Sequence, residues 1–128
     1  MKKDLDISIK RIYEPAADGD GYRILVDRLW PRGISKERAR LDEWVKDVSP
    51  SPALREWFHH EGGGFAAFAE QYEAELSNDE EKRACVAKII ERSGETHVTL
   101  LYGAKDPAEN HAVVLLQHIA RVADKGGR

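Results

Sequence analysis

Charged and aromatic residues follow the apolar run Ile24-Leu25-Val26. They include Asp27, Arg28, Trp30 and Arg32. Guanidinium groups bind phosphate or carboxylate through forked hydrogen bonds, an indole can stack on a planar ring, and a carboxylate can orient an arginine. The segment therefore predicts an anion-recognition edge that binds its ligand through Arg28, Trp30 and Arg32. In the alternative interpretation, Asp27 forms a structural salt bridge with one arginine and Trp30 fills the core.

A second segment of this kind follows Leu100 and Leu101 and contains Tyr102, Lys105, Asn110 and His111. If the last helix begins near residue 109 or 110, its free amides and positive dipole end favour an anion. We therefore predict ligand contacts from Tyr102, Lys105 and Asn110. If the site is catalytic, His111 is the proton-transfer candidate and Asp27 its orienter or a second base. A plain surface or packing role is the alternative for His111.

Buried strands must position both segments. Residues 23–27 form a continuous β-favouring run, and Val98, Leu100 and Leu101 indicate another buried strand; such runs are typical of strands covered on both faces. Residues 5–9 alternate apolar and polar types, which indicates a first strand with one wet face. Ligands gather beyond the carboxyl ends of strands in open α/β sheets. We therefore expect the two segments to line one cleft.

Apolar residues at helical spacing predict helices between these strands. They occur in residues 41–48, 54–58, 65–76, 80–93 and 111–122. Ser35 could cap a short helix, and residues 77–79 could cap the helix that ends at Gly94.

The fold class is predicted to be α/β: a small, single-domain layered structure with a short, mainly parallel sheet flanked by helices. Residues 1–124 would form the domain and 125–128 a flexible tail. The helix-free loop after the first strand suits an antiparallel return better than a parallel crossover, so that strand's place in the sheet stays open.

Composition excludes several classes of protein. The 128 residues are 41% hydrophobic with a net charge of −3, which argues against a disordered chain and a globally basic nucleic-acid binder. The sequence shows neither a signal peptide nor an apolar run of membrane-spanning length, so we expect a cytoplasmic protein with no membrane partner. Cys85 is the only cysteine, so neither an intramolecular disulfide nor a cysteine-rich zinc cluster can form.

Other candidate constellations are weaker. His59-His60-Glu61 suggests a metal site, but adjacent helical residues point about 100° apart, so no metal site is predicted. The glycines do not form a P-loop or dinucleotide motif, and no cofactor can be named. Tyr22 remains a candidate pocket residue beside the second strand. Cys85 is expected to pack against the core.

Four runs carry a resemblance to a known family: IKRIYEP, DGYRILVDRLWPRGISKERA, LDEWVKDVSPSPALREWF and LLYGAKDPAENHAVVL. They cover most of the chain and resemble the YeaO-like branch of the domain of unknown function 488 family, DUF488, which implies an α/β fold. The wider family has VDVR-type and LLCxExxxxxCHR-type segments, and the resemblance places Asp27 and His111 at matching positions. Tyr102 and Asn110 stand where that pattern has cysteines, Ala104 where it has glutamate and Ala112 where it has arginine. A thiol mechanism at those positions is therefore excluded.

We predict an anion- or phosphate-binding cleft at the carboxyl ends of the strands. The protein could be a small hydrolase or transferase acting on a nucleotide-like compound. Its partner would be a phosphorylated or other anionic small molecule. One alternative is a nucleic-acid-binding module in which basic residues contact phosphates and Trp30 stacks on an unpaired base. Another is a non-catalytic scaffold or regulatory protein.

Overall fold

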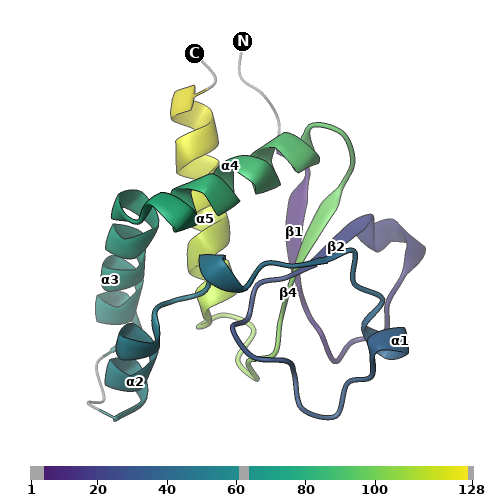
Figure 1. The fold of residues 1–128 in the computed structure, drawn as a ribbon, viewed down its shortest axis with the longest axis horizontal. Coiled ribbons are helices and arrows are strands. Elements are labelled where there is room, and N and C mark those ends of the chain that lie inside the picture. Colours follow the sequence, from purple (N-terminus) through teal and green to yellow (C-terminus); the bar gives the residue numbers. More distant parts are fainter. Residues whose placement is uncertain (1–4, 61–63, 127–128) are drawn as a thin grey trace.

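The fold contains a four-stranded sheet whose neighbouring strands are all parallel (Figure 1). The computed structural model describes residues 5–60 and 64–126. The strands are β1 (Ile7–Arg11), β2 (Tyr22–Leu25), β3 (Glu43–Trp44) and β4 (Val98–Tyr102), in the order β1-β4-β2-β3. This arrangement confirms the α/β class and the parallel sheet.

The last strand in sequence, β4, is central to the sheet. It pairs with β1 on one side and β2 on the other, and all five of its residues are buried because a core covers each face of the sheet. Ile7 and Tyr22 both lie opposite Val98 in the register. The first strand, whose place the sequence left open, is parallel to β4 and not the antiparallel return that its following loop favoured. A short connection without an α-helix suffices, because β4 is the one strand that lies between β1 and β2 in the described sheet.

The helices are α1 (Lys36–Ala39), α2 (Pro52–His60), α3 (Phe65–Asn78), α4 (Glu80–Ser93) and α5 (His111–Gly126), with short 3-10 turns η1 (Asp18–Asp20) and η2 (Lys46–Val48). Figure 1 shows α2 to α5 gathered on one side of the sheet and α1 on the other. As predicted, Ser35 caps α1 and Asp79 caps α4 with their side chains. The segment predicted as a tail begins inside α5, and residues 127 and 128 lie outside the described part of the chain.

The helix predicted over residues 41–48 is wrong. This stretch forms the edge strand β3 followed by η2. Backbone N–H groups of Asp42 and Val45 donate to the carbonyls of Arg23 and Leu25, so pairing with β2 takes precedence over the helical spacing of the apolar residues. Trp44 Nε1 also donates to the carbonyl of Asp27 at 2.7 Å, which ties this edge to the end of β2.

The sheet has a core on each face. Apolar residues of α3, α4 and α5 pack against Ile24, Val98 and Leu100 on one face. A smaller cluster on the other face contains Leu25 and Leu101. None of the helices within residues 5–60 and 64–126 is both long and apolar enough to cross a membrane.

A buried ionic network lies beside the smaller core. Arg23, only 4% exposed, bonds Asp20 through Nη1 at 2.5 Å and the carbonyl of Ala39 through Nη2 at 2.7 Å. Lys10 Nζ also donates to Asp20, at 3.0 Å. Burial alone would raise the pKa of Asp20, but hydrogen bonds from Ala17, Lys10 and Arg23 hold it below its ordinary value. This network joins β1, β2 and α1.

Candidate functional site

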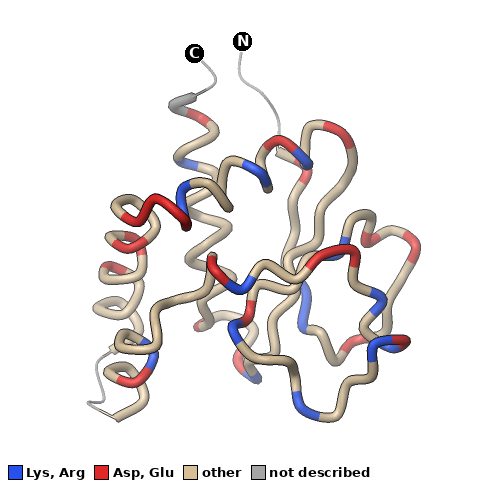
Figure 2. Tube along the Cα trace, in the orientation of Figure 1, with Lys and Arg blue, Asp and Glu red and all other residues tan. Residues whose placement is uncertain are grey.

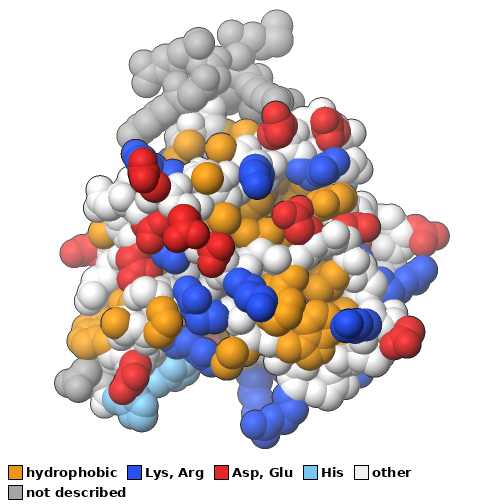
Figure 3. Space-filling model, in the orientation of Figure 1, with side chains coloured by type: hydrophobic (Ala, Val, Ile, Leu, Met, Phe, Trp, Pro, Cys, Tyr) orange, Lys and Arg blue, Asp and Glu red, His pale blue; other side chains and the backbone are white. Residues whose placement is uncertain are grey.

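A cleft of about 570 Å³ lies at the carboxyl ends of β2 and β4. The segments after both strands line it, and residues of α2 and α3 complete the wall. Figure 2 marks Lys and Arg positions on several separate segments in the lower part of the view. Figure 3 shows basic side chains in the same part of the view, close to histidines. The cleft therefore stands where the strand-end rule for α/β sheets places ligands.

The predicted site residues that line this cleft are Asp27, Arg28, Trp30, Arg32, Lys105, Asn110 and His111. Tyr102 does not line it: its side chain is only 3% exposed and belongs to the core of the helical face. Burial, together with the nearby Glu14 carboxylate, raises the pKa of the Tyr102 phenol. Tyr22 also lies elsewhere, with its hydroxyl donating to Glu43 at 3.0 Å.

Asp27 and His111 meet at the floor of the cleft. His111 Nε2 lies 3.1 Å from the carbonyl of Val26 and 3.0 Å from Asp27 Oδ1, but only the carbonyl has hydrogen-bond geometry. Asp27 Oδ2 accepts from the N–H of Gly103 at 2.9 Å. A Cβ at Gly103 would lie 3.0 Å from the same oxygen, so the close approach favours glycine. These contacts join the ends of β2 and β4 to the start of α5.

Four cationic side chains line the cleft: Arg28, Arg32, Arg55 and Lys105. Arg28 makes one long hydrogen bond, from Nη2 to the carbonyl of Pro50 at 3.4 Å, and its buried Nε has no partner in the described structure. Within residues 5–60 and 64–126, the side chains of the other three make no ion pair or hydrogen bond. Buried polar atoms are ordinarily satisfied, so the unpartnered Nε can accommodate one further hydrogen-bond acceptor.

Aromatic residues fix the loop between β2 and α1. Trp30 donates its Nε1 hydrogen to the carbonyl of Ile34 at 2.6 Å and packs edge-on against Trp44, with ring centroids 5.3 Å apart. Tyr13 donates its hydroxyl to the carbonyl of Arg32 at 2.8 Å. The indole of Trp30 thus contributes to loop packing as well as lining the cleft.

The start of α5 is partly satisfied by its own loop. Asn110 Oδ1 accepts from the N–H of Val113 at 3.1 Å, and its Nδ2 donates to the carbonyl of Asp106. Asp106 accepts from the backbone of Ala108 and Glu109, and these bonds lower the pKa of its carboxyl. Asn110 therefore acts as a helix cap, which reduces the number of amides open to a ligand.

Sequence reasoning missed the wall contributed by α2 and α3. Arg55, Phe58 and His59 come from α2, and Phe68 from α3. Leu29, 61% exposed, lies on the opposite loop of the same cleft. The spacing of apolar residues predicted both α2 and α3. It did not predict that these helices would face the carboxyl ends of the strands.

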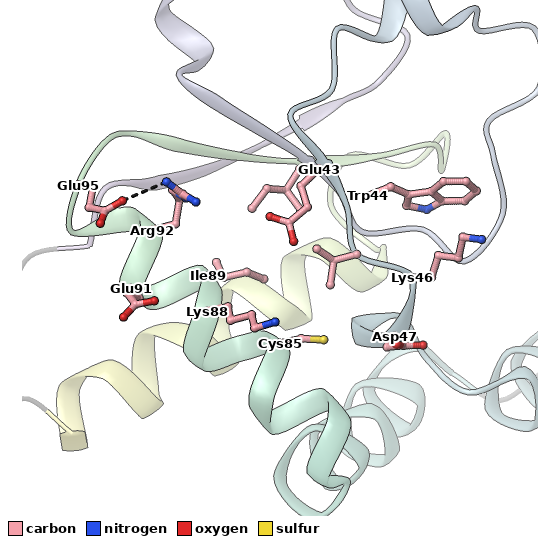
Figure 4. A pocket seen from close by; sticks show the side chains of 12 residues that line it. Glu43, Trp44, Lys46, Asp47, Cys85, Lys88, Ile89, Glu91, Arg92 and Glu95 are labelled. Carbon is pink, nitrogen blue, oxygen red and sulfur yellow. Dashed lines mark hydrogen bonds and ion pairs between the residues drawn. The ribbon is translucent and has the colours of Figure 1, made fainter.

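A second cavity, also about 570 Å³, lies between β3 and α4 (Figure 4). Its cations are mostly engaged: Arg92 pairs with Glu95 at 3.0 Å and stacks on Tyr22, and Lys46 stacks on Trp44. Figure 4 shows the sulfur of Cys85 directed toward the space beside Asp47. Burial raises the pKa of this thiol, and Asp47 adds to the effect. The carboxylates that line it, Glu43, Asp47, Glu91 and Glu95, outnumber the cations Lys46, Lys88 and Arg92, so this cavity is the weaker candidate for an anionic ligand.

Metal binding has no support from clustering of ligand side chains. Among the described residues, no group of three or more His, Cys, Asp or Glu side chains could hold an ion. Of the sequence His59-His60-Glu61, the glutamate lies outside the described residues.

Comparison with known proteins assigns nearly the whole described region to one family. A model described as the Inactive DUF488-N3 subclade matches residues 6–126. The chain belongs to the DUF488 family. The Uncharacterized protein YeaO of Escherichia coli (strain K12) is 50% identical over 111 residues, which cover 87% of this chain and 94% of that protein. Uncharacterized proteins of Mycobacterium bovis and Mycobacterium tuberculosis are 39% identical over 117 residues, covering 91% of this chain and 96% of theirs. No solved structure matches.

Proposed function

We propose that this DUF488 protein binds a small phosphorylated or carboxylated anion in the strand-end cleft and acts as a binding protein. The unpartnered Nε of Arg28 carries the proposal. A guanidinium whose buried N–H lacks a protein partner gains a charge-assisted hydrogen bond when an anion arrives. Arg32, Arg55 and Lys105 surround the same space and supply further positive charge.

The shape of the cleft favours a compact ligand with an apolar or planar part. A space of about 570 Å³ falls within the range of small-molecule sites. Phe58, Phe68 and the exposed Leu29 provide apolar surface beside the cations. A mononucleotide or a similar phosphorylated compound combines these two features, and a long nucleic-acid strand is not required to fill the cleft.

Binding without turnover is favoured over hydrolysis or group transfer. His111 Nε2 is engaged with the Val26 carbonyl, so this nitrogen already donates its proton to the protein. Asp27 is held through Oδ2, which accepts from the N–H of Gly103, while its buried Oδ1 has no hydrogen-bond partner among the described residues. The matched family model is described as inactive, which agrees with a structural role for this pair.

Calorimetry with phosphate, pyrophosphate, AMP, ATP and a short single-stranded oligonucleotide tests the proposal. Arg28→Met should weaken binding at least tenfold because it removes the partly buried cation, about 1.4 kcal/mol or more. Arg83→Met is the matched control, since Arg83 is exposed on α4 away from the cleft. A folded wild type that binds none of these compounds would overturn the proposal. Binding of the oligonucleotide alone would favour the nucleic-acid alternative.

His111→Gln separates binding from catalysis. For a binding protein, the substitution should lower stability while phosphate-compound affinity changes less than in Arg28→Met. Turnover of a bound phosphoester that disappears in this variant, with binding retained, would show that the cleft is catalytic.

A further inference from the structure

Three polar side chains at the opposite end of β4 form a chain of short hydrogen bonds. Ser8 Oγ lies 2.9 Å from His97 Nε2, and His97 Nδ1 lies 2.6 Å from Asp6 Oδ1. Ser8 is the second residue of β1, and Asp6 and His97 immediately precede β1 and β4. The cleft lies at the carboxyl ends of the strands, so this group is separate from it.

The parallel register of β1 and β4 creates the group. Ser8 lies opposite Thr99, which places Asp6 opposite His97 two residues earlier and therefore on the same face of the two strands. That face is the wet side of β1, since Ile7 and Ile9 pack toward the helical core. The side chains of Asp6 and His97 retain 63% and 30% of their exposure, so solvent and small molecules can reach them.

The proposed chemistry uses the neutral imidazole of His97 beside an ionised Asp6. In that state Asp6 only accepts, so His97 Nδ1 carries the proton and Nε2 presents a lone pair to Ser8. Thr99 Oγ1 is 3.5 Å from Ser8 Oγ, but it donates to the carbonyl of Asp20 at 2.7 Å. The Ser8 hydroxyl therefore donates to His97. This is the arrangement of nucleophile, base and orienting carboxylate used in acyl transfer.

We infer that Ser8, His97 and Asp6 form a second, nucleophilic site that cleaves small, activated carboxylic esters. Ser8 Oγ forms a bond to the acyl carbon while its proton moves to His97 Nε2. The bond from that carbon to the leaving oxygen breaks, and the leaving group takes the proton from His97. Water, deprotonated by His97, then releases the acid and restores Ser8.

The sheet edge supplies a donor for the developing oxyanion. β1 bonds to β4 through Asp6 and Ile12, and bonding residues alternate along a parallel strand. The N–H of Ile9, the residue after Ser8, therefore points to the open side of β1, the terminal strand of the sheet. One donor rather than a full oxyanion hole predicts slow turnover confined to activated esters.

Labelling with a fluorophosphonate probe, followed by peptide mass spectrometry, tests the site. The reaction forms a bond from Ser8 Oγ to phosphorus, expels fluoride and passes the proton to His97. Labelling should map to Ser8 and disappear in Ser8→Ala. His97→Gln should slow it on the order of 100-fold, and Asp6→Asn should slow it at least tenfold. Hydrolysis of p-nitrophenyl acetate should decline in the same order.

Ser77→Ala and His60→Gln are matched controls, because both residues are exposed on helices away from β1. Each should label at the wild-type rate. Circular dichroism of every variant checks folding. If His97→Gln does not fold, the labelling rate of Asp6→Asn tests the same inference. Absence of label at Ser8 in the wild type, or an unchanged rate in a folded His97→Gln or Asp6→Asn variant, would overturn the inference.

Discussion

Arg23 and Arg28 are the same residue type on one segment of chain, yet their surroundings differ. Arg23 is buried with its guanidinium bonded to Asp20 and to the carbonyls of Ala39 and Arg40. Arg28 has one long bond, to the carbonyl of Pro50, and a buried Nε with no partner in the described structure. The charge of Arg23 is used within the fold, whereas that of Arg28 makes only one long hydrogen bond, which is why we propose it as a ligand contact. Hydrogen-bond satisfaction, rather than residue type, separates the structural arginine from the candidate binding residue.

The largest effect should come from Arg23→Met. The substitution removes a buried cation and leaves Asp20 and two backbone carbonyls underbonded, so the free energy of unfolding should fall by about 3 to 5 kcal/mol. Urea denaturation measures the change. In the double variant Arg23→Met with Asp20→Asn, part of the loss should be recovered. A loss under about 1 kcal/mol would mean that the network is not structural.

Arg28→Met should give the opposite pattern. Its stability should stay within about 1 kcal/mol of the wild type, because the lost bond is long and the neighbouring Nε was already unsatisfied. Phosphate-compound binding should decline at least tenfold. A strongly destabilised Arg28→Met variant would show that Arg28, like Arg23, has a structural role.

The pH dependence of stability sharpens the same comparison. The pKa of Asp20 is lowered from its ordinary 3.8, so its stabilising contribution is complete above that value and is lost as pH falls through the folded-state pKa. The stability difference between the wild type and Asp20→Asn should therefore shrink between about pH 5 and pH 2. Urea titrations at a series of pH values measure it. If the stability difference between the two proteins did not change with pH, the charge of Asp20 would not be the source of its stabilising effect.

Cys85→Ser should have the smallest effect. The thiol is half-buried beside the core, so the substitution should cost about 1 kcal/mol in unfolding free energy while leaving binding in the strand-end cleft unchanged. Cys85→Ala separates loss of volume from burial of a hydroxyl. A well-folded Cys85→Ser variant that no longer binds would connect the second cavity to function.

The sequence was informative where physical rules link local pattern to position. Two buried strands ending in charged segments sufficed to predict that Asp27 and His111 come together, because parallel strands end at the same edge. The caps at Ser35 and Asp79 followed from local hydrogen bonding. Tyr102 was misjudged as a lining residue, because the direction of a side chain at a strand end depends on register.

Other features depend on contacts between segments far apart in the chain, which local sequence patterns do not predict. The apolar residues at 41–48 suit a helix, and only the neighbouring edge of β2 makes them a strand. Arg55 faces the cleft because α2 packs beside α3, which its own spacing does not encode. Ser8 and His97 are separated by most of the chain, so their contact becomes visible only once β1 is known to pair with β4.

The strand order also has a consequence for biosynthesis. β1 and β2 are not neighbours, and each finds its principal partner in β4, which begins only at Val98. A nascent chain emerging from the ribosome therefore holds β1 unpaired, and β2 paired only with the short strand β3, until β4 has been made. Such late, non-local closure is slow and leaves strand edges open to aggregation. Fragments that end before β4 should consequently collect as insoluble or chaperone-bound material.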